Sequence, residues 1–279
     1  MNPVESHPVD PQNETILVAD VGNSRIKLAV VAQAAPALPQ PTLPQIQHRF
    51  DLDSHRFTAD EFEGWLMTVA PGAATVFLAS VYDAAAERLG AIIAGTSATR
   101  HRAVHQRRIR FDDFPLTVEA AEPERVGIDR LAAAVAASRL GQAGRGCVVV
   151  DCGTAASVDL VADGRFLGGA ILPGPALMAR SLADGTSLLP EVAALGEQPP
   201  PPLPGRVTAE AIAAGIGFGI RGAIVRLVEE ARQSLGGEAD LFLTGGWRGA
   251  VRGELPGVVE SPDLVLSGIG LAAVSLAAG

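Results

Sequence analysis

The stretch ILVADVGNSRIKLAVV, from Ile16 to Val31, carries an apolar run into a polar DVGN turn at Asp20 and out again into a second apolar run. A near copy, CVVVDCGTAASVDLVA, extends from Cys147 to Ala162. Apolar runs on both sides of a glycine-containing turn predict a hairpin of two buried strands. Because the copies begin about one domain length apart, the sequence predicts a duplicated domain, each half opening with the same strand–turn–strand unit.

The first turn carries the groups that an anionic ligand requires. Gly22 lets backbone amides approach an anion closely, Asn23 and Ser24 add donors, and Lys27 adds positive charge. A carboxylate such as Asp20 fits this setting when it orders magnesium or the waters of magnesium. This combination is typical of a site for a nucleotide polyphosphate.

The second turn repeats some of these polar groups. Asp151 and Thr154 supply the same carboxylate and a hydroxyl, but no lysine follows them. One Asp-Gly turn alone is an ordinary hairpin turn. Two such turns, each flanked by strands and separated by about one domain length, instead favour two domains that bind one ligand together.

The composition agrees with that of a soluble two-domain enzyme. The 279 residues are 48% hydrophobic and 19% charged, which is enough apolar material for two cores. The chain shows neither a secretory leader pattern nor an uninterrupted apolar run long enough to cross a bilayer, so we expect a cytoplasmic protein with no membrane partner. A net charge of −9 argues against nucleic acid as the main partner.

Two further sequence features receive ordinary structural interpretations. The basic run from Arg100 to Arg110 holds five arginines and two histidines without interleaved aromatic residues, and we expect it to be solvated surface. Cys147 and Cys152 lack the spacing and the histidine partners of a zinc site, so both are expected to be buried apolar residues.

Hydrophobic periodicity divides the chain into three parts: a disordered extension at 1–14, a first domain at 15–140 and a second domain at 141–279. Strands of the first domain are predicted at 15–20, 25–32, 45–52, 75–81 and 103–109, and helices at 59–69, 84–94 and 130–140. The second domain repeats the hairpin, with further strands predicted at 165–172 and 240–244 and helices at 176–183, 209–235 and from 268.

The segment PERVGIDR, from Pro123 to Arg130, places a carboxylate and a guanidinium side by side where the interdomain helix begins. Asp129 can cap that helix. It can equally be the base that takes a proton from an acceptor hydroxyl, with Arg130 binding an acidic group of the same substrate. Spacing along the chain leaves both interpretations open.

The helix at 209–235 raises a similar choice. Its glycines permit close backbone packing, and five apolar residues recur at spacings of three and four: Ile212, Ile216, Ile220, Ile224 and Leu227. This stripe suits a partner helix in a dimer. The alternative is that it faces the core of its own domain.

The motifs DVGNSRIK, PERVGIDR, DCGTA, GGAILPG, TAEAIAAG and TGG follow one another between Leu17 and Ala278. In this order the chain resembles the type III pantothenate kinases, members of the superfamily of acetate kinase, hexokinase and actin. The resemblance implies an α/β fold of two ribonuclease-H-like (actin-like ATPase) domains with mixed five-stranded sheets and helices, a homodimer, and ATP and pantothenate between the domains. The implied activity is that of a transferase: ATP-dependent phosphorylation of pantothenate to 4'-phosphopantothenate, the first step of coenzyme A biosynthesis.

The resemblance also implies roles for individual residues. The ATP-binding residues would be Asp20, Val21, Gly22, Asn23, Ser24, Arg25, Ile26, Lys27 and Thr154. Pantothenate would be bound by Gly127, Ile128, Asp129, Arg130 and Thr208, with Asp129 as the general base. Asp151 would bind a monovalent cation, potassium or ammonium, and magnesium would accompany ATP. Thr208 would lie near the dimer interface, although its position before Ala209 also fits a helix cap.

The chain departs from the family pattern at three positions. Ala120 stands where a tyrosine often lines the pantothenate pocket, Leu131 where an aromatic residue is common, and Ser24 where threonine is usual. The alanine leaves open a kinase of another small hydroxy acid. A catalytically inactive accessory or regulatory relative is the non-enzyme alternative, and four intact polar residues count against it: Asp20, Asp129, Asp151 and Thr154.

Overall fold

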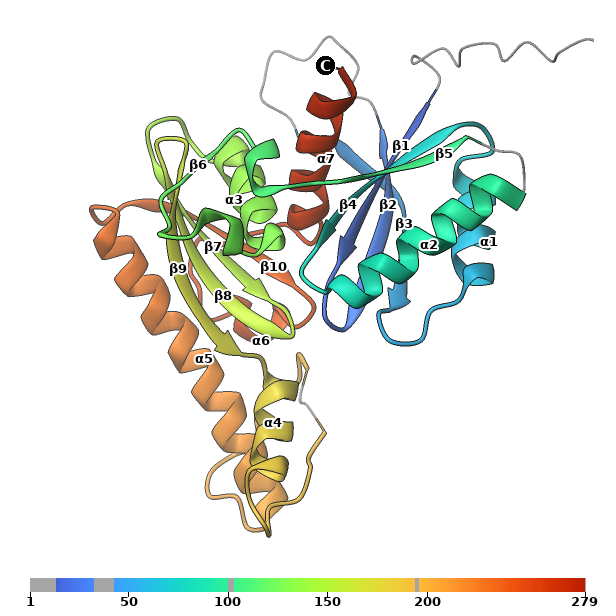
Figure 1. Ribbon diagram of the computed structural model, residues 1–279. Coiled ribbons are helices and arrows are strands. Elements are labelled where there is room, and N and C mark those ends of the chain that lie inside the picture. The colour runs from blue at the N-terminus through green and yellow to red at the C-terminus, as the bar shows by residue number, and fades with distance from the viewer. Residues whose placement is uncertain (1–13, 33–42, 100–102, 194–195, 279) are drawn as a thin grey trace, which may run out of the picture. The chain divides into compact units, whose positions relative to one another are not determined.

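A computed structural model describes residues 14–32, 43–99, 103–193 and 196–278. They form two compact units, each built around its own sheet (Figure 1). One unit runs up to Phe114 and also contains Gly127–Asp129 and the residues from Leu266. The other consists of Pro115–Val126 and Arg130–Val265.

The extension predicted at 1–14 lies outside the described residues, apart from Glu14. That residue differs from the prediction, because its carboxylate accepts a hydrogen bond from the Thr75 hydroxyl at 2.5 Å. The bond fixes the chain at the point where it enters the first strand.

The first sheet has the strand order β3-β2-β1-β4-β5. Its first three strands are antiparallel neighbours, and the last two are parallel to β1. The strands are β1 (Thr15–Val21), β2 (Arg25–Ala32), β3 (Gln45–Asp53), β4 (Ala74–Ser80) and β5 (Val104–Arg108). All five predicted strands of this domain are confirmed.

Helices cover both faces of the first sheet (Figure 1). α1 (Ala59–Val69) and α2 (Asp83–Thr99) pack on the face formed by alternate apolar residues of β1 and β2. α1 begins at a capping box, in which Thr58 and Glu61 satisfy each other's backbone N–H groups. α7 (Leu264–Ala278) packs on the opposite face, where Gly270 lies against Val31.

The second sheet repeats this topology. Its order is β11-β10-β7-β8-β9-β6, in which β7, β8 and β9 are antiparallel neighbours and β10 and β11 continue in parallel. The strands are β6 (Thr117–Val118), β7 (Gly146–Cys152), β8 (Ala155–Ala162), β9 (Arg165–Pro173), β10 (Ala239–Gly245) and β11 (Val259–Glu260). The prediction of two ribonuclease-H-like domains with mixed sheets is confirmed. This sheet has six strands rather than five, because the two-residue β6 joins its edge, and so short a strand has no periodicity to reveal it.

Helices also enclose the second sheet. α5 (Thr208–Ser234) packs on one face, where Val148 and Val150 of β7 share a core with Ile220 and Ile224. α3 (Ile128–Leu140) lies on the other face, and its Ala137 carbonyl accepts a hydrogen bond from the thiol of Cys147. Two smaller helices complete the unit: α4 (Pro175–Asp184), which lies beside α5 (Figure 1), and α6 (Gly249–Arg252).

The apolar stripe of α5 faces its own domain, so the proposal that it packs on a partner helix is wrong. Ile220 and Ile224 are almost fully buried in the core, and Ile212 and Ile216 pack against Ala179 of α4. In the described part of the chain, α5 alone is long and apolar enough to cross a membrane by length and composition. A core helix passes the same test, and its buried stripe identifies α5 as one.

The observed units differ from the predicted division into 15–140 and 141–279. Residues 115–126 and 130–140 belong to the second unit because β6 pairs with β9, Thr117 lying opposite Arg165, and because α3 covers β7. The last helix starts at Leu264 rather than at 268 and returns to the first unit. Periodicity identifies an element but not the sheet that it covers.

The surface and core assignments hold for the residues described. In the basic run, the side chains of β5 from His105 to Arg108 are exposed, Arg108 forms an ion pair with Asp83, and Arg107 donates to the Leu276 carbonyl at 3.2 Å. Residues 100–102 of that run lie outside the described part. Both cysteines are buried and free.

Candidate active site

The first turn links β1 and β2 and is closed by a hydrogen bond from the Gly22 N–H to the Arg25 carbonyl at 3.0 Å. Asp20 and Lys27 lie directly opposite each other across the two strands. The Lys27 ammonium donates to the Asp20 carboxylate at 2.9 Å, and the Asp20 side chain is only 7% exposed. The lysine therefore neutralises a buried carboxylate as well as adding charge to the turn.

Neighbouring strand ends hold this turn from both sides. The Ser54 hydroxyl, just after β3, donates to the Gly22 carbonyl at 2.7 Å, and the Ser54 N–H donates to the Ser24 carbonyl at 3.2 Å. On the other side, the Val81 N–H donates to the Val21 carbonyl at 3.1 Å. Sequence reasoning missed Ser54, because only strand pairing brings it to a turn so far away along the chain.

The second turn, between β7 and β8, is held by the equivalent strand ends. Here the Gly174 N–H donates to the Thr154 carbonyl at 3.0 Å. This bond corresponds to the one from the Ser54 N–H to the Ser24 carbonyl at the first turn. The Trp247 indole N–H donates to the Gly153 carbonyl at 2.7 Å, and the Trp247 backbone N–H donates to the Cys152 carbonyl at 3.3 Å. The motifs DCGTA, GGAILPG and TGG thus meet at one turn.

Two glycines permit that meeting. A Cβ at Gly174 would lie 2.6 Å from the Gly153 carbonyl oxygen and 2.7 Å from that of Thr154. Gly245 has φ +95°, and a Cβ there would lie under 3.0 Å from the backbone of Cys152. Both positions therefore require glycine for close backbone approach.

Asp129 lies in the first turn of α3, which begins at Ile128. It is therefore inside the helix rather than at the N-cap position before it, although its charge still favours the helix N-terminus. Residues 127–130 are half-buried. Leu131, which follows them, is fully buried in the core.

Arg130 has a carboxylate partner that sequence reasoning missed. Its Nε donates to the two carboxylate oxygens of Asp159 at 3.0 and 3.2 Å, and its Nη2 also donates to Asp159. Ser157 donates its hydroxyl to the same carboxylate at 2.8 Å. Burial raises the pKa of Asp159, while the hydrogen bonds from Arg130 and Ser157 oppose that rise.

Thr208 is the first residue of α5 and is exposed. The capping position is Val207 rather than Thr208, and the side chain there makes no cap hydrogen bond, so the helix-cap explanation of Thr208 is wrong. Thr208 lies at the end of α5 that packs against α4, not at the end that packs against the sheet. Ala120 is half-buried after β6.

The donor set around Asp151 limits the kind of cation it could hold. Among the residues that the structure describes, no three acidic, histidine or cysteine side chains gather as a metal site. Asp151 is half-buried and adjoins a turn whose other oxygens are neutral. One carboxylate with neutral oxygens suits a cation of low charge density better than a dehydrated divalent ion.

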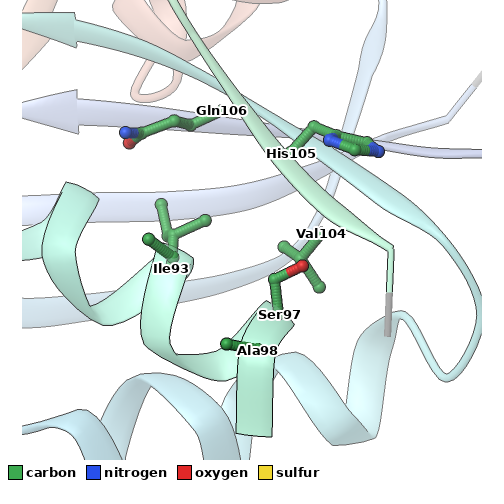
Figure 2. Close-up of a pocket in the computed structure, with 7 residues that line it drawn as sticks. Ile93, Ser97, Ala98, Val104, His105 and Gln106 are labelled. Carbon is green, nitrogen blue, oxygen red and sulfur yellow. The ribbon is translucent and has the colours of Figure 1, made fainter. Parts of the chain in front are cut away.

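Two cavities lie against β5 in the first unit. Figure 2 shows the smaller, about 390 Å³, where Ile93, Ser97 and Ala98 of α2 face the β5 strand. The larger, about 620 Å³, is bounded by the end of α7. The described residues that line them include none of the predicted site residues.

Comparison with known proteins points to one family. A family model described as type III pantothenate kinase matches residues 16–230. A type III pantothenate kinase of Rhodopirellula baltica is 34% identical over 267 residues, covering 88% of this chain and 94% of that protein. Another, from Alkalilimnicola ehrlichii, is 33% identical over 265 residues, covering 91% and 95%.

Solved structures share the fold at low sequence identity. A Campylobacter jejuni protein described as a Baf family transcriptional activator superimposes with a TM-score of 0.55 at 18% identity, covering 93% of this chain and 98% of that one. A Sinorhizobium meliloti protein described as a 2-dehydro-3-deoxygalactonokinase superimposes with a TM-score of 0.52 at 16% identity, covering 94% of this chain and 99% of that one. Sequence identity along nearly the whole chain, together with six ordered motifs and the duplicated turns, establishes that the chain belongs to the type III pantothenate kinase family.

Proposed function

We propose that the protein transfers the γ-phosphoryl group of ATP to the primary hydroxyl of pantothenate, forming 4'-phosphopantothenate in the biosynthesis of coenzyme A. This is the function of the family to which the chain belongs. The structural observation that carries it is the duplicated turn, closed in each unit by two hydrogen-bonded strand ends. Rigid turns of this kind supply backbone donors at fixed positions, which phosphoryl transfer requires.

The nucleotide would be bound through its phosphates. Asn23, Ser24 and Arg25 are exposed at the tip of the first turn and offer amide, hydroxyl and guanidinium donors. Thr154 offers a hydroxyl from the second turn. Asp20, which is paired with Lys27, would order the waters of the magnesium ion that accompanies ATP.

The acceptor would lie at the start of α3. Asp129 would accept the proton of the attacking hydroxyl, and Arg130 would bind the carboxylate of pantothenate. Most of the rate gain would come from alignment and charge neutralisation, with the base adding about a hundredfold or more. Gly127 and Ile128 would contact the substrate through the chain that leads into the helix.

We further propose that Asp151 binds potassium or ammonium. Its cross-strand partner is Ser157, whereas Asp20 in the first copy faces Lys27. A serine thus stands in the second copy at the position that the lysine occupies in the first. A monovalent cation there would supply the positive charge near the phosphates.

A homodimer is proposed through the outer face of α5 rather than its buried stripe. On that face Phe218 is 49% exposed, and a Cβ added at Gly215, Gly219 or Gly222 would meet nothing within 4 Å. A large apolar residue among exposed glycines lets a second helix approach closely. Thr208 begins the same helix and would reach the acceptor bound by the partner. The assembly would act in the cytoplasm, with ATP and pantothenate as ligands and neither membrane nor nucleic acid as partner.

One assay tests the proposed reaction. ADP release is measured with ATP, magnesium and potassium, using pantothenate and a panel of small hydroxy acids as acceptors. Pantothenate-dependent release with mass-spectrometric detection of 4'-phosphopantothenate is expected. Preference for another acid would favour the alternative kinase that Ala120 leaves open, and no release with any acceptor would favour an inactive relative.

A further inference from the structure

A row of polar side chains crosses the face of the second sheet that α3 covers. Asp151 and Ser157 are direct cross-strand neighbours on β7 and β8, so their side chains lie on one face about 5 Å apart. Asp159 is two residues beyond Ser157 on β8 and therefore points to the same face. The Ser157 hydroxyl donates to Asp159, and Asp159 in turn accepts from Arg130 of α3.

The side chains of this cluster are largely buried and closely packed. The Asp159 side chain is 2% exposed and that of Arg130 is 17% exposed, so the pair is largely removed from water. The Phe166 ring lies with its centroid 5.3 Å from the Arg130 guanidinium carbon. Gly169, the cross-strand partner of Asp159, leaves the space that the carboxylate occupies, because a Cβ there would lie under 3.0 Å from an Asp159 oxygen.

At the equivalent strand positions, which the structure describes, the first copy of the domain has no such cluster. By strand register, Lys27 occupies the position of Ser157, and Ala29 occupies the position of Asp159. The buried carboxylate is therefore an addition to the second copy, in the domain that contributes Arg130. A buried ion pair contributes little to stability compared with apolar packing, which points to a role in holding the arginine.

We propose that Asp159 is a positioning residue: it fixes the guanidinium of Arg130 in the orientation in which that group binds the carboxylate of the acceptor. This inference rests on the proposed function of Arg130. A guanidinium has five N–H donors in one plane, so bonds from Nε and Nη2 to one carboxylate set the orientation of that plane. Ser157 completes the arrangement by fixing the carboxylate itself.

The experiment compares steady-state kinetics of four full-length forms: wild type, Asp159→Asn, Arg130→Gln and the double variant. Asp159→Asn should raise KM for pantothenate about tenfold or more while leaving KM for ATP within about twofold, as is typical when the hydrogen-bonded support of a binding group is removed. In the Arg130→Gln background the same substitution should raise KM for pantothenate by less than about twofold further, because the effects of substitutions that act through one contact are not additive. Asp163→Asn is the matched control, since it removes an exposed carboxylate from the turn of the same hairpin.

Ser157→Ala keeps the test decisive if Asp159→Asn does not fold. It removes only the hydroxyl and should raise KM for pantothenate about threefold, with no such rise in the Arg130→Gln background. Equal rises in KM for both substrates, or an undiminished effect without Arg130, would assign Asp159 a purely structural role. If the wild-type enzyme does not phosphorylate pantothenate, both the proposed acceptor and this inference are overturned. If the wild type is active and Asp159→Asn leaves its KM for pantothenate unchanged, only the inference is overturned.

Discussion

Asp129 and Asp151 are half-buried carboxylates for which the structure and the proposed chemistry suggest different tasks. Asp129 stands in the first turn of α3, where a helix N-terminus stabilises the charged form. Asp151 stands at the end of β7, beside a turn of neutral oxygens. Single substitutions at these two residues therefore separate proton transfer from cation binding.

Asp129→Asn should fold and bind ATP but turn over at least about a hundredfold more slowly, because an amide of the same shape cannot accept the proton. Thermal unfolding, ATP titration and the ADP-release rate measure the three properties. Near-normal turnover would restrict Asp129 to stabilising the start of the helix.

The cation response should depend on Asp151. Activity is expected to rise with potassium or ammonium and to stay low in sodium alone, at constant ionic strength. Asp151→Ala should abolish that response, since the carboxylate supplies the charge that holds the ion. A variant with full activity and an unchanged cation response would show that the ion binds elsewhere or is not used.

At the scale of elements, each turn is held by the ends of the strands beside it. In the second unit this requires β10 to end against the Cys152 backbone, which Gly245 permits with φ +95°. The next residue, Gly246, has nothing within 4 Å of an added Cβ. The two neighbouring glycines thus differ in backbone conformation and in how closely they pack against the turn.

Gly245→Ala should destabilise the fold by about 1–3 kcal/mol from backbone strain alone and should raise KM for ATP by displacing the second turn. Gly246→Ala should leave both properties close to wild type. Thermal unfolding and ATP kinetics of the two variants provide the comparison. If both alanines behave alike, close packing at TGG does not position the turn.

At the scale of the molecule, α5 has two apolar sides with different consequences. Ile220 is 1% exposed in the core, whereas Phe218 is 49% exposed on the opposite side. The buried side holds the second domain together, and the exposed side is the one proposed for dimer contact.

Ile220→Asp should fail to fold, because an unpaired buried carboxylate costs about 3–5 kcal/mol. Phe218→Glu should give a folded monomer with much reduced activity, because Thr208 could no longer reach the partner's acceptor. Sedimentation with circular dichroism separates the two results. A Phe218→Glu protein that is monomeric, folded and fully active would exclude the shared site.

The local pattern of the chain was sufficient to predict the duplicated hairpin, the order of the main strands and helices, and the two Asp-Gly turns. Each of these depends on side-chain period and turn chemistry within one short segment. The hairpin of β1 and β2 and the helix α1 therefore agree with their predicted ranges within one residue.

Tertiary structure alone decided which distant residues meet. Ser54 at the first turn, Trp247 at the second and Asp159 beside Arg130 are brought there by strand register, which periodicity does not specify. The same reason explains why α7 returns to the first sheet and why the stripe of α5 faces inward. An amphipathic helix encodes that one face will be buried, but the surface that buries it is determined only when the whole chain packs.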